Sequence, residues 1–119
     1  MKILLLIISL FALGCQYQNE ETLYPVTSGC DSLSITYSRT IAPIIQSNCG
    51  NCHSANNSSA GGGNVFDNYT DVKNNIDIII GCINHQSGYS SMPKGSSQKI
   101  DACAIRQIEK WALNGAVNN

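Results

Sequence analysis

The sequence predicts an all-α fold, a small domain of three or more helices joined by long loops. Two stretches, residues 37–48 and 101–115, carry apolar side chains at the spacing of one helical face. A third apolar run, residues 76–83, has the length and β-branching of a strand, but no comparable second strand exists to pair with it. Apart from one short expected helix that ends near Asn75, the rest of the domain is loop. So much loop in a small domain indicates that something other than polypeptide fills part of its centre.

The first expected helix covers residues 37–48. Ser38 is expected to cap it. Pro43 stands slightly late for a first-turn proline, which predicts a kink or a later start. The helix would run directly into CGNCHS, residues 49–54. Its apolar face consists of Tyr37, Ile41, Ile44 and Ile45.

The middle of the domain alternates between loop and short helix. Residues 54–64, SANNSSAGGGN, predict a loop whose glycines supply flexible backbone. A phosphate-binding loop is not supported, because no strand leads in and no lysine follows. Thr70 is expected to cap a short helix ending near Asn75. Residues 76–83 then form a buried helical or extended segment, followed by a loop that contains Pro93.

The last helix has the clearest signals. Asp101 is expected to cap its start, and Gly115 suits the position just after its end. Its buried stripe is predicted to consist of Ala104, Ile105, Ile108, Trp111 and Ala112.

The motif CGNCHS offers three chemistries: a haem, a zinc ion or a redox-active dithiol. In a helix, Cys49, Cys52 and His53 would project together, because residues three and four apart share a face. Two thiols at this spacing can add across the two vinyl groups of one haem. The adjacent imidazole then reaches the iron, which is the physical basis of the Cys-x-x-Cys-His attachment motif.

The two rival chemistries lack their usual context. A zinc site with Cys82 and His85 as a second half can be drawn, but it does not match common spacings. A thioredoxin-like dithiol lies at the start of a helix that follows a strand, whereas here the cysteines follow the end of a helix. The sequence therefore favours one covalently attached haem c.

Met92 is the predicted second axial ligand. Histidine with methionine is the usual ligation of small electron-transfer cytochromes c, and Met92 is the only methionine apart from Met1. It lies in a polar loop, where a purely packing role is less expected. His85 is the competitor and would give bis-histidine ligation; a place near the haem edge or at the surface is the plainer reading of that residue.

Four segments of the chain resemble the planctomycete-type cytochrome c-like domains found on bacterial lipoproteins, a class I monohaem group. They are CDSLSITYSRTIAPIIQSNCGNCHS, VFDNYTDVKNNID, INHQSGYSSMPKG and KIDACAIRQIEKWALNGA, which together span nearly all of residues 30–117. The resemblance implies a cytochrome c-like fold, in which the first and last helices cross near the attachment site and Trp111 packs beside the haem.

Six cysteines divide unevenly among the expected roles. The resemblance implies a disulfide between Cys30 and Cys103, in a compartment where disulfides persist. Cys82 then stays a free buried thiol, and a pairing of Cys82 with Cys103 is the alternative. The remaining cysteine, Cys15, belongs to the N-terminal segment.

The N-terminus predicts export. Lys2 precedes a short apolar run, residues 3–13, which is too short to span a membrane and is typical of a signal peptide. ALGC, residues 12–15, resembles a lipobox, which implies cleavage before Cys15 and its diacylation; ordinary secretion is the alternative. We therefore expect a signal peptide (1–14), a lipidated tether (15–29) and a cytochrome c-like domain (30–119) facing the periplasm or cell exterior.

Charge gives little information about partners. Seven basic and eight acidic side chains leave the chain nearly neutral, without the basic footprint of a nucleic-acid binder. No acid–base or nucleophilic constellation is visible, so the sequence predicts an electron-transfer protein with redox partner proteins and not an independent catalyst. A haem-based ligand-binding or sensing module and an accessory haem subunit of a larger oxidoreductase are the alternatives.

Overall fold

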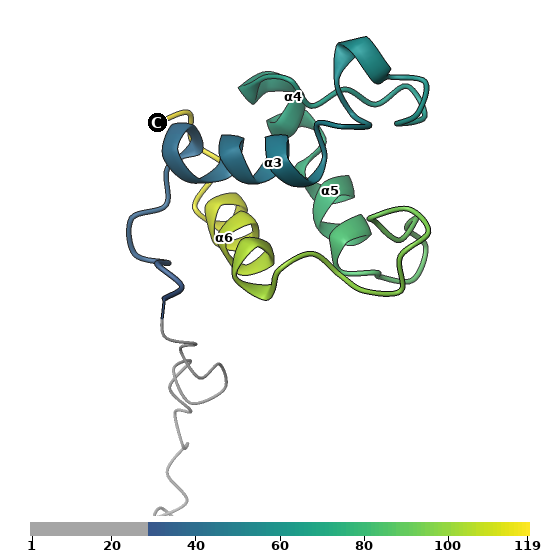
Figure 1. Ribbon diagram of the computed structural model, residues 1–119. Coiled ribbons are helices and arrows are strands. Elements are labelled where there is room, and N and C mark those ends of the chain that lie inside the picture. The colour runs from purple at the N-terminus through teal and green to yellow at the C-terminus, as the bar shows by residue number, and fades with distance from the viewer. Residues whose placement is uncertain (1–28) are drawn as a thin grey trace, which may run out of the picture. The chain divides into compact units, whose positions relative to one another are not determined.

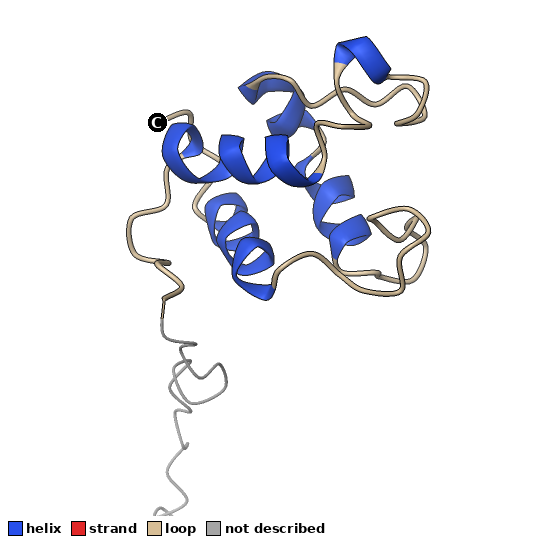
Figure 2. Cartoon of the chain, viewed as in Figure 1, coloured by secondary structure: helices blue, strands red, loops and turns tan. Residues whose placement is uncertain are grey.

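Every regular element in the described part of the chain, residues 29–119 of the computed structural model, is helical, as Figures 1 and 2 show. This confirms the all-α prediction for that part. Residues 31–119 form one compact unit. Along it follow the π-helical turn η1 (Tyr37–Ile41), α3 (Ala42–Asn48), the 3-10 turn η2 (Ala55–Asn57), α4 (Tyr69–Asn74), α5 (Ile76–Ile83) and α6 (Ala102–Leu113).

The N-terminal segment lies largely outside the described residues. This holds for the predicted signal peptide, for Cys15 and for all but the last residue of the predicted tether. Among the helices from residue 29 onward, none combines the length and the apolar character that crossing a membrane requires.

The first helix starts differently from its prediction. Thr36, and not Ser38, is the N-cap: its side-chain oxygen accepts a hydrogen bond from the backbone N–H of Arg39. Hydrogen bonds of the i to i−5 type, such as Ile41 N to Thr36 O at 3.2 Å, widen the turn into η1 before α3 begins. Pro43 lies in the first turn of α3, where its missing N–H matters least. The predicted irregularity thus takes the form of a π turn.

The middle helices show which residue caps α4 and which conformation residues 76–83 adopt. Asn68, and not Thr70, caps α4, because its side chain accepts from the Asp71 N–H and donates to the Asp71 carboxylate. Residues 76–83 form a helix, α5, with Ile79, Gly81 and Ile83 buried. Since no strand lies alongside within residues 29–119, only a helix satisfies the backbone hydrogen bonds of this apolar run.

The last helix begins and ends as predicted. The Asp101 carboxylate accepts from the Ala104 N–H at 3.0 Å. At the other end Gly115, with φ +88°, and Ala116 donate back to the carbonyls of the last turn, which is the Schellman arrangement. Four members of the predicted stripe are buried and Ala112 is half-buried.

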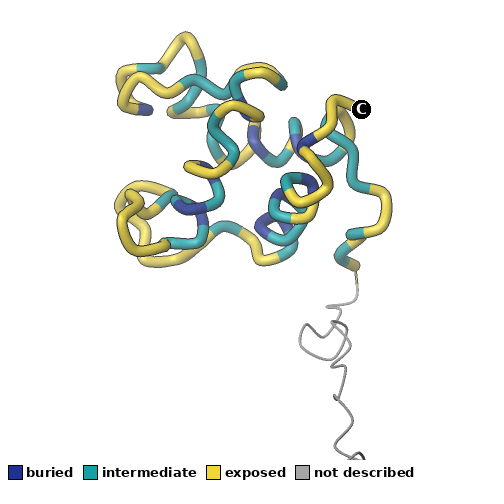
Figure 3. Tube along the Cα trace, turned by 180° about the vertical axis from the view of Figure 1, so that it is seen from behind, coloured by how far each residue is buried: buried dark blue, intermediate teal, exposed yellow. Residues whose placement is uncertain are grey.

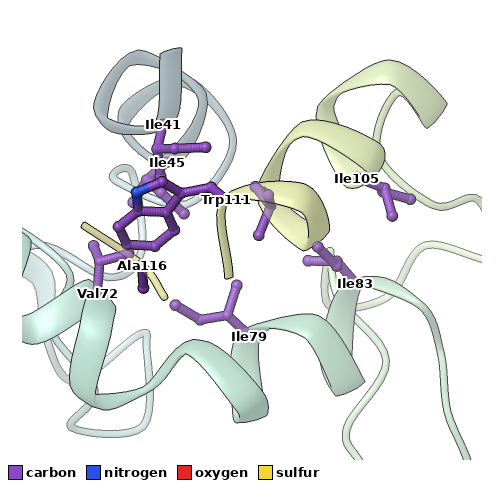
Figure 4. Packing of buried hydrophobic residues seen from close by; sticks show 9 residues of the cluster. Ile41, Ile45, Val72, Ile79, Ile83, Ile105, Trp111 and Ala116 are labelled. Carbon is purple, nitrogen blue, oxygen red and sulfur yellow. The ribbon is translucent and has the colours of Figure 1, made fainter. Parts of the chain in front are cut away.

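The core lies between these helices, with Trp111 at its centre (Figure 4). The indole is 2 % exposed, and its ring centroid lies 5.6 Å from that of Tyr37 in η1. Its Nε1–H donates to the Val117 carbonyl, and the Tyr69 hydroxyl donates to the Ala116 carbonyl, so both polar tips are satisfied. The buried cluster consists of Ile41, Ile45, Val72, Ile79, Ile83, Ile105, Ile108, Trp111 and Ala116.

A disulfide joins Cys30 to Cys103, the second residue of α6. This is the pairing that the family resemblance implies, and it rules out the alternative Cys82–Cys103 pairing in this structure. Cys49, Cys52 and Cys82 are free thiols.

Candidate functional site

The Cys-x-x-Cys-His motif begins at the C-terminal end of α3, as the sequence predicts, and Cys52 and His53 lie beyond the regular helix. Cys49 caps α3, and its N–H donates to the Ile45 carbonyl at 2.8 Å. From there the chain runs in turns, but the N–H groups of Cys52 and His53 both donate to the Cys49 carbonyl, at 3.1 and 2.8 Å. These bonds keep the three residues within one hydrogen-bonded turn. The two cysteines and the histidine are therefore held near one another without a regular helix.

The two thiols of the motif differ in their surroundings. Cys49 is half-buried and packs against the core, and this burial raises the pKa of its thiol to about 11. Cys52 is exposed, and the two are not bonded to each other. A redox-active dithiol needs a thiolate favoured by a helix N-terminus. Cys49 lies at a helix C-terminus and is held protonated, so the structure argues against that chemistry.

The His53 ring is held by a backbone carbonyl and a phenyl ring. Its Nδ1 lies 3.1 Å from the Asn64 carbonyl oxygen, and because that oxygen can only accept, Nδ1 carries the proton. The Phe66 ring stacks on the imidazole at a centroid distance of 4.7 Å and an angle of 18°. The Phe66 N–H also donates to the His53 carbonyl. Nε2 is therefore left with its lone pair free, which is the form in which histidine binds a metal.

Gly61 allows this loop to approach His53. A Cβ at residue 61 would lie 2.6 Å from the Cys52 carbonyl oxygen and 2.7 Å from His53 Nδ1, closer than real Cβ atoms come. The sequence interpretation assigned the three consecutive glycines to flexible backbone alone and missed this close contact. Asn64 was missed as well, because a backbone carbonyl acceptor leaves no signature in the residue type.

Met92 lies in the loop that follows α5, and its backbone is tied to that helix from both sides. Its N–H donates to the Cys82 carbonyl at 3.1 Å. Its carbonyl accepts from Nε2 of His85 at 2.9 Å. The side chain is half-buried. Met92 is thus held in place within an otherwise exposed stretch.

The His85 side chain makes one of these two hydrogen bonds to the Met92 backbone. Because the Met92 carbonyl can only accept, Nε2 of His85 carries the proton and has no lone pair to offer a metal. The two histidines of the chain therefore hold opposite tautomers. Only His53 keeps Nε2 free, which argues against the bis-histidine alternative in this arrangement.

The two loops that carry the predicted ligands lie on the side of the unit away from the C-terminus (Figure 1). Their positions are largely exposed, whereas the buried positions gather on the helices, as Figure 3 shows. Beside the motif lies a hollow of about 130 Å³ that Gly50 and Phe66 help to line. It is smaller than the roughly 300–1,000 Å³ of ordinary cofactor pockets.

No group of three or more histidine, cysteine, aspartate or glutamate side chains is gathered for a metal ion in the described residues. The residues of the zinc alternative, Cys82 and His85 together with the Cys49–Cys52 pair, are therefore not brought together. Cys49, Cys52 and His53 fit a covalently held haem: two unpaired thiols followed by an imidazole with its Nε2 lone pair available.

The comparisons with known proteins add no identification. No family model, no curated protein and no solved structure matches the chain.

Proposed function

We propose that the domain is a monohaem c-type cytochrome that passes single electrons, with haem c attached through Cys49 and Cys52 and the iron bound by His53. The observation that carries the proposal is the hydrogen bond from His53 Nδ1 to the Asn64 carbonyl. It fixes the tautomer that leaves Nε2 available, on the residue that directly follows the Cys-x-x-Cys pair. The environment of the thiols supports attachment over dithiol chemistry.

Met92 is the proposed second axial ligand. Its backbone is fixed at both its N–H and its carbonyl, so its thioether starts from a defined place in the loop. The competing histidine uses Nε2 to make one of these two bonds. Methionine opposite histidine favours a higher reduction potential than two histidines do.

The cytochrome c-like fold is part of the same proposal. Supporting observations are the packing of α6 against η1 through Trp111, and the contact of Cys49 with the same core. The polypeptide leaves apolar side chains such as Ile78 and Tyr89 partly exposed, at 51 % and 43 %, which a bound haem could cover.

The bound haem supplies a reversible one-electron change at iron. The chain's own residues Cys49, Cys52 and His53 would hold the ring and the surrounding polypeptide would limit the access of water to it. The protein would therefore exchange electrons with redox partner proteins. We place it outside the cytoplasm, anchored to a membrane through a diacylated Cys15, with ordinary secretion as the alternative.

Covalent haem in the exported protein tests the proposal. The full chain would be produced with working haem-attachment machinery, and haem content measured after denaturation. We expect one haem in the wild type, and loss of attachment in the double variant Cys49→Ser/Cys52→Ser. Cys82→Ser is the matched control, because it removes the third free thiol and should leave attachment unchanged. A wild type without covalent haem, or equal haem in all three chains, would refute the assignment.

A further inference from the structure

His85 has a left-handed backbone conformation, which is uncommon for residues other than glycine, although histidine adopts it more often than most. Its φ is +54°, in the left-handed region, directly after the end of α5. The N–H of His85 donates to the Cys82 carbonyl and that of Gln86 to the Gly81 carbonyl, the same Schellman arrangement that ends α6. In α6 the equivalent position holds Gly115, the residue that adopts this conformation at least cost. Ala116, the residue after Gly115, also has a positive φ, so the conformation alone assigns no role to His85, and its side-chain contact has to supply one.

That side chain makes one hydrogen bond, and the bond reaches Met92. Nε2 donates to the Met92 carbonyl across seven positions of the sequence, while the Met92 N–H returns to the Cys82 carbonyl. A third contact presses the same loop on α5. The Tyr89 ring covers Gly81 so closely that a Cβ there would lie 2.5 Å from it.

The loop between these contacts has little else to order it. Residues 86–91, QSGYSS, are all exposed, and Gly88 has a positive φ. Short polar side chains and glycine give such a segment many conformations when it is unrestrained. The His85 side chain is therefore the one side-chain hydrogen bond, among the described contacts, that fastens Met92 to a helix.

We propose that His85 is a positioning residue: the hydrogen bond from its Nε2 to the Met92 carbonyl holds the Met92 loop against α5 and keeps the thioether available as an axial ligand. This inference rests on the proposed function for its consequence at the iron. The tie itself belongs to the polypeptide and can be measured without reference to the haem.

Two substitutions separate positioning from ligation. His85→Gly removes the donor and also relieves the left-handed backbone, so the chain is expected to fold. His85→Gln restores an amide N–H near the position of Nε2 but cannot replace an imidazole as an iron ligand. Gln86→Ala is the control, because Gln86 is exposed and makes only backbone hydrogen bonds.

The first readout is hydrogen exchange at the Met92 amide in the full mature chain. Loss of one tie is expected to speed this exchange about tenfold in His85→Gly, in line with the net contribution of a hydrogen bond, and His85→Gln should restore most of the protection. Unchanged exchange in His85→Gly would overturn the inference whether or not the protein carries haem.

The second readout is carbon monoxide binding to the reduced haem protein, which requires the methionine to leave the iron. We expect binding about tenfold faster in His85→Gly and close to wild type in His85→Gln and Gln86→Ala. If His85→Gln binds as fast as His85→Gly, the imidazole itself is required and the positioning role is overturned. Met92→Ala gives the rate of carbon monoxide binding when the methionine is absent. An unchanged rate in this variant would refute Met92 ligation. The hydrogen bond from His85 would still be tested by the exchange measurement.

Discussion

His53 and His85 carry their ring protons on opposite nitrogens, and this difference assigns them different roles. A carbonyl oxygen fixes each ring, that of Asn64 for His53 and that of Met92 for His85. Because one bond uses Nδ1 and the other Nε2, His53 offers Nε2 to a metal whereas His85 could offer only Nδ1. The sequence distinguished them only by position, because His53 follows the Cys-x-x-Cys pair whereas His85 competes with Met92.

Cys49 should be the less reactive cysteine of the motif in the haem-free chain. Its thiol pKa is raised from 9.0 to about 11 by burial, so at pH 8 its thiolate fraction is about 100-fold lower than that of an unshifted thiol. Alkylation of the haem-free chain at pH 8, followed by mass spectrometry of peptides, should therefore label the exposed Cys52 first.

The pH dependence of the labelling tests the direction of the pKa shift at Cys49. Labelling of Cys49 should rise about tenfold for each pH unit until the pH approaches 11, because only the thiolate reacts. In urea the two cysteines should react at similar rates, which is the control. Equal rates in the folded chain would contradict the assigned burial of Cys49.

Gly61 should tolerate no side chain. Gly61→Ala places a Cβ against the Cys52 carbonyl and His53 Nδ1, so the loop must shift and the Asn64–His53 bond must lengthen. We expect a loss of about 1–3 kcal/mol in the free energy of unfolding in urea, and faster exchange of the Nδ1 proton in NMR spectra. Gly62→Asn is the control, since a Cβ at Gly62 meets nothing within 4 Å and asparagine tolerates its positive φ. Equal losses in both variants would show that no specific clash exists at residue 61.

At the scale of elements, helix existence was easier to predict than the cap residue. Ser38 and Thr70 are chemically suitable caps, yet Thr36 and Asn68, two positions earlier in each case, make the bonds. The choice depends on where extended backbone gives way to helix, and several neighbouring polar residues satisfy the same sequence rule. Asp101 was predictable because no competing acceptor stands directly beside it.

The run 76–83 shows why periodicity needs tertiary context. Its composition suits a strand, but a strand must pair and nothing between residues 29 and 119 offers an edge. Burial of Ile79 and Ile83, four residues apart, places them on the one helix face that meets the core.

Asp101 should stabilise α6 through its cap. Asp101→Ala removes the acceptor for the Ala104 N–H and should lower the free energy of unfolding by about 1 kcal/mol. Asp101→Asn keeps an acceptor and should stay near wild type, as measured by urea unfolding followed by circular dichroism. An Asn variant as unstable as the Ala variant would indicate that charge, and not the cap bond, matters at this position.

For the whole molecule, the all-α class and the Cys-x-x-Cys-His motif could be read from the sequence, but the residues that support the motif could not. The motif has a fixed spacing of residue types. Its partners are a backbone carbonyl at Asn64 and a close backbone approach at Gly61, and neither is encoded by a distinctive side chain. The same holds for His85, whose target is the main chain of Met92.

The disulfide should contribute strongly to the stability of so small a domain. Cys30 and Cys103 are 73 positions apart (103 − 30), and closing a loop of that length stabilises the folded state by roughly 4 kcal/mol in the chain-entropy model. The double variant Cys30→Ser/Cys103→Ser should unfold at a clearly lower urea concentration than wild type. Cys82→Ser, which removes a thiol without breaking a bridge, should change the midpoint far less. Equal midpoints for all three chains would contradict a stabilising contribution from the disulfide.

The central claim is that Cys49 and Cys52 carry a haem, and the denatured mass of the exported chain tests it most directly. We expect a mass increase equal to one haem over the processed polypeptide, with the modification on the peptide that contains residues 49–53. An exported chain with the unmodified mass, produced where a known c-type cytochrome is matured normally, would contradict it.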